Sequence, residues 1–196
     1  MSLGKQAKTL TKGQMDAIQG YLASTRHPAR NQVIFLLSVK AGLRAKEIAS
    51  ITWDMVTDAG GSVGTTLNLT DVAAKGRSGR IIPLNKELRC SLVRLMALRP
   101  NGRRCSPYVI TTERAGKTSA AAVVNLFAGW YRALGFTGCS SHSGRRTFVT
   151  NAARRISTVG GSLRDVQLLA GHSALSTTQR YIDADAMAQR KVVELV

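Results

Sequence analysis

The chain has 196 residues, of which 28 are Lys or Arg and 11 are Asp or Glu, so its formal net charge at pH 7 is +17. This length suffices for one ordinary domain or two small ones, with a core that folds without disulfides or metal. No run approaches the roughly 18 apolar residues of a membrane span, and the first residues are polar and basic, so we expect a cytoplasmic protein without signal peptide or membrane contact.

The positive charge is unevenly distributed. Residues 71–117 contain 11 Lys or Arg against three acids, whereas residues 118–140 contain one basic residue and no acidic one. This imbalance favours a polyanionic partner, because each neutralised phosphate releases condensed counterions. A solvated basic surface or an RNA-bound protein would show the same charge. The charge therefore suggests a nucleic-acid partner but does not indicate which reaction the protein catalyses. The three cysteines lie far apart without zinc-site spacing, and we expect reduced thiols and no metal.

Helical spacing dominates the first fifty residues. Thr11 and Gln14 have the spacing of a capping box at the start of a first helix. A second helix is predicted over residues 29–40, because Pro28 suits a first helical turn and Gly42 a helix end. A short helix over residues 44–50 places Arg44 near its start.

The pattern then changes to a small hairpin. Residues 65–70 and 80–83 alternate as strands do, and the basic turn between them contains two glycines. Helical patterning returns over residues 86–98 and stops at Pro100. Residues 101–117 read as loop with a short strand at 108–110.

The rest of the chain is predicted to be helical. Helices are expected over residues 118–134, 142–155, 162–170 and 177–182, with a last one over 185–195. Trp53 and Trp130 are expected in the core. The fold class is therefore mainly α with a small antiparallel β-sheet (α+β). We expect a disordered or cloning-derived segment over residues 1–9, one domain over 10–182, and a C-terminal tail over 183–196 that can be helical and contact another subunit.

Some residues have the chemistry to break a phosphodiester without a metal. Such a reaction needs an in-line nucleophile, positive charge on the non-bridging oxygens and a proton for the leaving oxygen. Arginine forks suit the oxygens, Lys or His can give the proton, and Tyr can attack. Five segments supply these groups: GLRAKEI (42–48), AKG with RIIPL (74–76 and 80–84), HSGR (142–145), LAGH (169–172) and TTQRY (177–181).

In this order and spacing the segments resemble the tyrosine recombinase (phage integrase) family over residues 10–182. The resemblance implies the catalytic-domain fold of that family and a site-specific DNA recombinase or integrase of a mobile genetic element. It implies strand cleavage and rejoining through a 3′-phosphotyrosyl intermediate, without metal or cofactor. Double-stranded DNA and a tetramer of the chain on DNA are the implied partners.

The resemblance assigns a role to each matching catalytic residue. Arg44 and Arg145 match the two arginines that clamp the scissile phosphate. Lys75 matches the lysine that protonates the leaving 5′ oxygen. His142 matches a proton acceptor for the nucleophile.

The remaining matches concern two residues of the later segments and one acidic residue of the first. His172 matches a histidine that hydrogen-bonds a non-bridging oxygen, and Tyr181 matches the nucleophile nine positions later. Glu47 matches a commonly acidic, structural position. Two positions depart from the family, which often has Leu where Gly144 stands and His where Arg146 stands. Gly144 lowers helix propensity by up to about 1 kcal/mol, which predicts looser packing there.

Further basic residues are expected to contact backbone phosphates, with a solvated surface as the alternative. They are Arg77, Arg80, Arg103, Arg104, Lys117, Arg146, Arg154, Arg155 and Arg164. Because the family usually has a separate DNA-binding domain before the position of Leu10, we expect weak DNA binding by this chain alone. Two rival functions remain open: a type IB topoisomerase that relaxes supercoils, and an inactive DNA-binding relative.

Overall fold

The computed structural model describes residues 7–74, 79–99, 106–113, 115–181 and 193–194. In this part of the chain the fold is mainly helical with one two-stranded antiparallel sheet, which confirms the predicted class. The helices are α1 (Lys12–Ala23), α2 (Pro28–Ala41), α3 (Ala45–Ser50), α4 (Lys86–Ala97), α5 (Ala120–Ala133), α6 (Ser143–Arg155), α7 (Leu163–Ala170) and α8 (Leu175–Gln179), with 3₁₀ turns η1 (Trp53–Met55) and η2 (Ile156–Val159). The strands are β1 (Thr66–Leu69) and β2 (Arg80–Pro83).

The helix ends follow the local chemistry of the sequence. The Thr11 hydroxyl accepts from the Gln14 N–H, and the Gln14 side chain returns a bond to the Thr11 N–H, which completes the predicted capping box. Pro28 opens α2, and Gly42 ends it in the left-handed region at φ 67°. An added Cβ at Gly42 would also overlap the Phe148 ring of α6. Both the backbone conformation and the lack of space for a side chain therefore favour glycine at this position.

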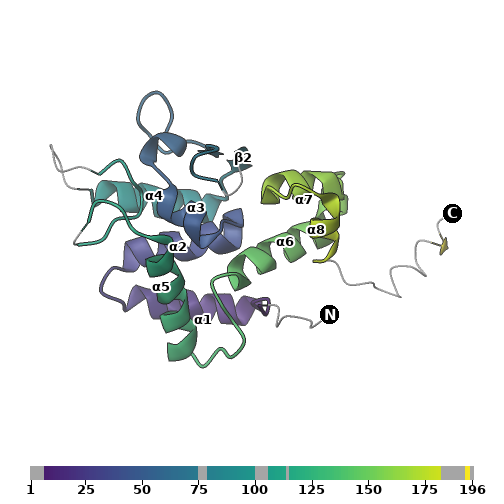
Figure 1. The fold of residues 1–196 in the computed structure, drawn as a ribbon, viewed down its shortest axis with the longest axis horizontal. Helices are drawn as coiled ribbons and strands as arrows, with labels where there is room; N and C mark the ends of the chain where they lie inside the picture. The colour runs from purple at the N-terminus through teal and green to yellow at the C-terminus, as the bar shows by residue number, and fades with distance from the viewer. Residues whose placement is uncertain (1–6, 75–78, 100–105, 114, 182–192, 195–196) are drawn as a thin grey trace.

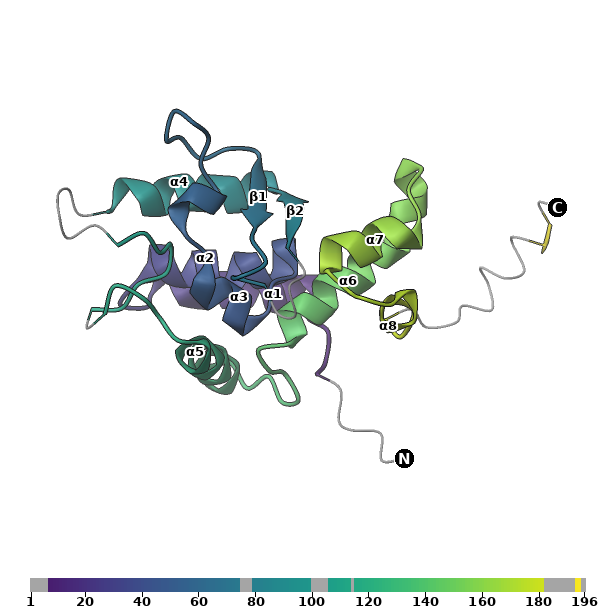
Figure 2. The ribbon, with the colours of Figure 1, turned by 45° about the horizontal axis from the view of Figure 1, so that its top comes forward.

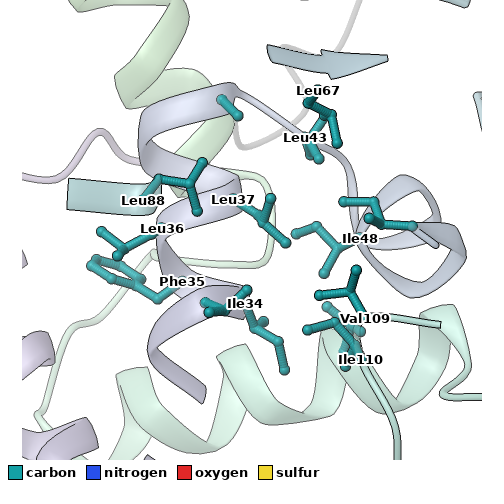
Figure 3. Packing of buried hydrophobic residues seen from close by; sticks show 14 of the residues in the cluster. Ile34, Phe35, Leu36, Leu37, Leu43, Ile48, Leu67, Leu88, Val109 and Ile110 are labelled. Carbon is teal, nitrogen blue, oxygen red and sulfur yellow. The ribbon is translucent and has the colours of Figure 1, made fainter. Parts of the chain in front are cut away.

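The main core surrounds α2. This helix is buried on nearly all sides along residues 33–39, where all residues but Ser38 are apolar. Its side chains Ile34 and Leu37 pack among residues from α3, β1, α4 and the 109–110 segment (Figure 3). Trp53 and Trp130 are both buried, as predicted.

The sheet is a single hairpin. Leu67 pairs with Ile82 and both side chains point into the core, while Ile81 faces outward. The predicted strand at 108–110 is reduced to an isolated bridge between Thr52 and Tyr108. The backbone of residues 108–109 pairs with the 51–53 segment and not with the hairpin, since the N–H of Val109 donates to the Ile51 carbonyl at 2.9 Å.

Helices α6, α7 and α8 form a second unit beside the main body (Figures 1 and 2). Helices α6 and α7 share a small core built on Val149, Val166 and Ala170, and Tyr181, which follows α8, packs against it. The prediction of loose packing at Gly144 is wrong, because an added Cβ there would lie 2.9 Å from Ser38 Cβ and 3.0 Å from Val39 Cγ1. Glycine therefore lets α6 approach α2 closely and joins the second unit to the body.

The chain ends differ in part from the expectation. Residues 7–9 belong to the ordered fold, because the Lys8 N–H donates to the Gly138 carbonyl at 3.1 Å. The Leu10 N–H donates to Thr147 Oγ1 at 2.7 Å, inside the structure. Helix α8 begins two residues before the predicted start and ends before Tyr181. Most of the predicted helix over 185–195 lies outside the described residues. Among described helices, none has the length and apolar character to cross a membrane.

Candidate active site

Arg44, Glu47 and Arg80 form one ion-pair cluster. The Glu47 carboxylate is fully buried, and its Oε1 accepts from Arg44 Nη1 at 3.0 Å. Arg80 donates from Nη1 to Oε1 at 3.2 Å and from Nη2 to Oε2 at 3.3 Å. Burial acts to raise the pKa of Glu47, but the hydrogen bond and charge of Arg80, followed by those of Arg44, outweigh it and hold this pKa below its ordinary value. The carboxylate thus fixes two guanidiniums, of which Arg44 stays partly exposed at 24%.

Arg145 lies in the first half of α6 and connects this helix to the ends of α2 and α7. Its Nη1 donates to the Gly42 carbonyl at 2.6 Å and its Nη2 to the Ala170 carbonyl at 2.7 Å, with only 3% of the residue exposed. Burial, and then the charge of Arg44, lowers the pKa of Arg145 to about 10. Because this value stays above neutrality, Arg145 remains a cation near pH 7 and holds further donors beside the two already used.

His172 lies just beyond the end of α7 and is buried. Its Nδ1 is 2.9 Å from Thr178 Oγ1 of α8. Burial first, and then the charges of Arg145, Arg44 and Arg80, lower its pKa to about 4. The imidazole is therefore neutral near pH 7 and carries one proton that can be donated.

Tyr181 follows α8 and is half-buried. Its ring stacks on His172 with centroids 5.6 Å apart and planes inclined by 19°, and Arg146 Cζ lies 6.0 Å from the ring centroid. A cavity of about 400 Å³ opens beside the phenol. Its walls include the side chains of His142, Arg145, Arg146 and Tyr181, together with Ala7, Ser140, Thr177 and Arg180. One space thus brings together a phenol, an imidazole and a buried guanidinium.

The predicted catalytic residues of the described part converge. His142, Arg145 and Tyr181 line the cavity, and His172 stacks on the phenol. Arg44 is close enough to Arg145 for its charge to lower the Arg145 pKa. Lys75, the sixth predicted catalytic residue, lies outside the described residues. The same holds for three of the predicted phosphate contacts, Arg77, Arg103 and Arg104.

The other predicted DNA contacts fall into two groups. Lys117, Arg154, Arg155 and Arg164 are exposed, and Lys117 Nζ lies 4.7 Å from the Tyr108 ring centroid. Arg146 is half-buried and faces the cavity. Their contact with phosphates stays a prediction.

Arg80 departs from the surface position expected of it. Its side chain is 7% exposed and binds Glu47, and its Nε donates to the Leu169 carbonyl at 2.9 Å. The sequence around Arg80 is a basic turn, which reads as surface. Only the approach of α3 and α7 in three dimensions supplies its partners and buries it.

Sequence reasoning did not single out Thr178, Arg180 or Ser140. Thr178 lies beside the His172 ring, while Arg180 and Ser140 contribute to the cavity. Closeness to Tyr181 and His142 in the chain was the available signal. Partners such as the Gly42 and Ala170 carbonyls carry no sequence signal at all, because every residue has one.

Comparison with known sequences identifies a matching family model and several relatives of the chain. A model described as the phage integrase family matches residues 8–187. The tyrosine recombinase XerC of Brucella melitensis biotype 1 is 27% identical over 167 residues, which cover 85% of this chain and 50% of that protein. The tyrosine recombinase XerA of Pyrococcus horikoshii is 28% identical over 190 residues, covering 95% and 60%. The chain spans about half the length of the curated relatives it matches.

Solved structures share the fold. A Tn1549 transposon integrase in complex with a circular intermediate DNA superposes with a TM-score of 0.75 at 18% identity, over 99% of this chain and 67% of that one. A XerA recombinase crystal structure gives 0.73 at 20% identity, over 95% and 64%. With a family match over most of its length and the fold of a tyrosine recombinase catalytic domain, this chain belongs to the phage integrase family.

Proposed function

We propose that this domain cleaves and rejoins DNA strands as a site-specific recombinase or integrase, with Tyr181 as nucleophile. The observation that carries the proposal is the shared cavity of Tyr181, His142 and Arg145, with the His172 ring stacked on the phenol. A lone tyrosine near a basic surface would not explain a buried cation and a neutral imidazole beside its ring. A phosphate that gains negative charge in the transition state would explain both groups, because a cation and a hydrogen-bond donor stabilise that charge.

The proposed reaction uses only side chains of this chain. The Tyr181 oxygen attacks the phosphorus and forms a 3′-phosphotyrosyl bond while the bond from phosphorus to the 5′ oxygen breaks. His142 accepts the phenol proton, and Lys75 gives a proton to the leaving 5′ oxygen. Rejoining reverses these transfers with a 5′ hydroxyl of the partner strand, so the bond energy is conserved without a nucleotide cofactor.

Two guanidiniums and one imidazole serve the non-bridging oxygens. Arg44 and Arg145 can each donate parallel hydrogen bonds to phosphate while their other donors stay on Glu47 and on backbone carbonyls. The neutral His172 adds a hydrogen bond without adding a charge. By analogy with the transposon integrase bound to DNA, double-stranded DNA is the substrate. We propose a tetramer of the chain as the assembly that exchanges strands, because recombination needs two cuts in each of two duplexes.

The test is covalent capture on DNA. A library of nicked duplexes with randomised sequence is incubated with the protein, and SDS-resistant adducts are isolated and sequenced. We expect an adduct on Tyr181 that Tyr181→Phe abolishes and that EDTA leaves unchanged, while Tyr21→Phe, a phenol outside the site, forms it normally. An adduct on another residue would refute the mechanism, as would a dependence on metal.

The rival functions predict different products. A type IB topoisomerase would relax a supercoiled plasmid without any paired site, whereas a recombinase exchanges strands between two copies of the captured sequence. An inactive DNA-binding relative would bind the library and form no adduct. Plasmid relaxation and two-site recombination, measured side by side, distinguish the three.

A further inference from the structure

Polar contacts attach the helices that carry His172 and Tyr181 to the main body. Helices α6 and α7 share a small core that is separate from the main core, and Tyr181, which follows α8, packs against it. Two arginines from outside α7 reach its last turn, where Arg80 Nε binds the Leu169 carbonyl and Arg145 Nη2 binds the Ala170 carbonyl. The last carbonyls of a helix lack partners within it and favour cations, so both guanidiniums cap α7.

Arg80 reaches two elements at once from the first position of β2. Its two Nη atoms hold the Glu47 carboxylate of α3 while its Nε holds α7. The backbone passes so close that a Cβ at Gly171 would lie 2.7 Å from Arg80 Nη1 and 3.0 Å from Arg80 Cζ. The end of α7 is therefore fitted to this guanidinium by both hydrogen bonding and shape.

We propose that Arg80 is a positioning residue that sets where His172 and Tyr181 stand relative to Arg44. The proposal rests on the proposed function for its catalytic consequence and on the contacts above for its structural one. Arg145 makes a similar bond to α7 but is also assigned to the phosphate. Its side chain is 7% exposed, its Nε donates to Leu169 and both its Nη atoms donate to Glu47, so we assign Arg80 an action through these residues and not on DNA.

Because Arg80 is charged, its positioning role can also be followed through the pKa of His172. Burial, and then Arg145, Arg44 and Arg80, lower the pKa of His172. Among the described residues, the groups that face the imidazole include these three guanidiniums, the Thr178 hydroxyl and the Tyr181 ring. Removing the Arg80 charge should raise the His172 pKa, whereas replacing Arg80 with Lys should leave it nearly unchanged.

The experiment compares Arg80→Met and Arg80→Lys with Arg89→Met. Arg89 also donates from Nε to a backbone carbonyl, that of Val63 at 3.3 Å, but it belongs to α4 and not to the site. Amide hydrogen exchange, NMR titration of His172, affinity for a nicked duplex and the rate of adduct formation are measured for each variant.

In Arg80→Met we expect amides of residues 163–181 to exchange about tenfold faster, with those of α2 unchanged. Adduct formation should fall about a hundredfold while the affinity for the duplex changes less than about threefold, because a small displacement of reacting groups has that effect on rate. Arg80→Lys should recover part of the rate and keep the wild-type His172 pKa, and Arg89→Met should behave as wild type.

Unchanged exchange in residues 163–181 would overturn the proposal, as would faster exchange throughout the chain. An equal loss of DNA affinity and of rate would also contradict it, since it would make Arg80 a DNA contact. If wild type forms no adduct, the proposed function fails, and the exchange and titration measurements still decide the positioning role. If Arg80→Met does not fold, the same measurements on Arg80→Lys decide it, with faster exchange confined to residues 163–181 as the supporting result.

Discussion

At the scale of single residues, the Glu47 carboxylate is the shared counter-charge of Arg44 and Arg80. Replacing it with Gln leaves two guanidiniums without their anion in a buried place, which costs about 3 kcal/mol. We therefore expect Glu47→Gln to lower the free energy of unfolding by about that amount in urea titrations. As control, Glu87→Gln breaks a pair with Lys40 that is about one-third exposed and should cost less than about 1 kcal/mol. Similar losses in both variants would contradict the argument.

The same carboxylate makes part of the stability depend on acid. The pKa of Glu47 is lower in the folded protein than its ordinary value of 4.5, so its stabilising contribution is full above 4.5 and disappears as the pH falls through the folded value. The difference in stability between wild type and Glu47→Gln should therefore shrink as acid is added below pH 4.5. A constant difference across this window, measured by urea titration at each pH, would show that Glu47 does not titrate in this way.

Thr178 should decide which nitrogen of His172 carries the proton. If the Thr178 hydroxyl donates to Nδ1, the proton of the neutral imidazole lies on Nε2, where it can be given to a phosphate oxygen. Thr178→Val should reduce adduct formation about tenfold by removing this bond, and Thr178→Ser should restore it. Thr158→Val changes an exposed hydroxyl on η2 and should leave the rate unchanged. An equal loss in the Ser variant would mean that the methyl group matters and the hydroxyl does not.

Residue types and spacing predicted which side chains gather at the site, but not what holds them. Tyr181 and His172 have a motif spacing that suffices to propose their roles. The burial of Arg80 could not be predicted, because Glu47 is 33 positions away and Leu169 is 89 positions away in the chain. Arg80, which was expected at the surface, is buried and caps the end of α7 through contacts that exist only in the folded protein.

At the scale of elements, two helical glycines, Gly144 in the first turn of α6 and Gly129 in α5, should respond in opposite ways to the same change. A Cβ at Gly144 in α6 would meet Ser38 of α2, so Gly144→Ala should destabilise the protein by about 1–3 kcal/mol. Gly129 in α5 has no such neighbour within 4 Å, and Gly129→Ala should stabilise it by about 0.5–1 kcal/mol. Thermal unfolding of both variants measures this.

The clash itself can be tested separately. Ser38→Gly removes the two atoms nearest to an alanine Cβ at 144, Oγ and Cβ of Ser38, and leaves Val39 Cγ1 in place. Combining it with Gly144→Ala should therefore cost less than the sum of the two single changes, a coupling that neighbouring residues show. Additive effects would place the cost of Gly144→Ala elsewhere in α6.

Elements with local stop and start signals were predicted closely. Thr11, Pro28 and Gly42 each act through their own backbone geometry or a bond three residues away, so the sequence carries the whole signal. The strand expected at 108–110 failed because strand formation depends on the distant partner, and here the partner is the 51–53 segment. The tight α2–α6 contact at Gly144 was missed for the same reason.

At the scale of the whole molecule, the charge of +17 should govern DNA affinity and its dependence on salt. We expect micromolar or weaker binding at physiological salt by this chain alone. Arg154→Ala, at the exposed end of α6, should weaken binding to all sequences alike and reduce the salt slope by about 1. Lys12→Ala, whose ammonium is paired with Asp16, should change neither. Gel-shift titrations at several salt concentrations provide the measurement, and nanomolar affinity would contradict the first expectation.

The buried His172 should give the whole protein a second pH dependence, above that of Glu47. Its pKa of about 4 in the folded protein lies below its ordinary value of 6.5, so between these values the unfolded state binds more protons than the folded one. Stability should therefore rise with pH from about 4 to 6.5 and be lost as pH falls through this window. His172→Gln cannot take up the proton and should flatten the curve there. An unaltered curve for His172→Gln, in urea titrations across the window, would mean that burial and the three guanidiniums do not keep this imidazole neutral.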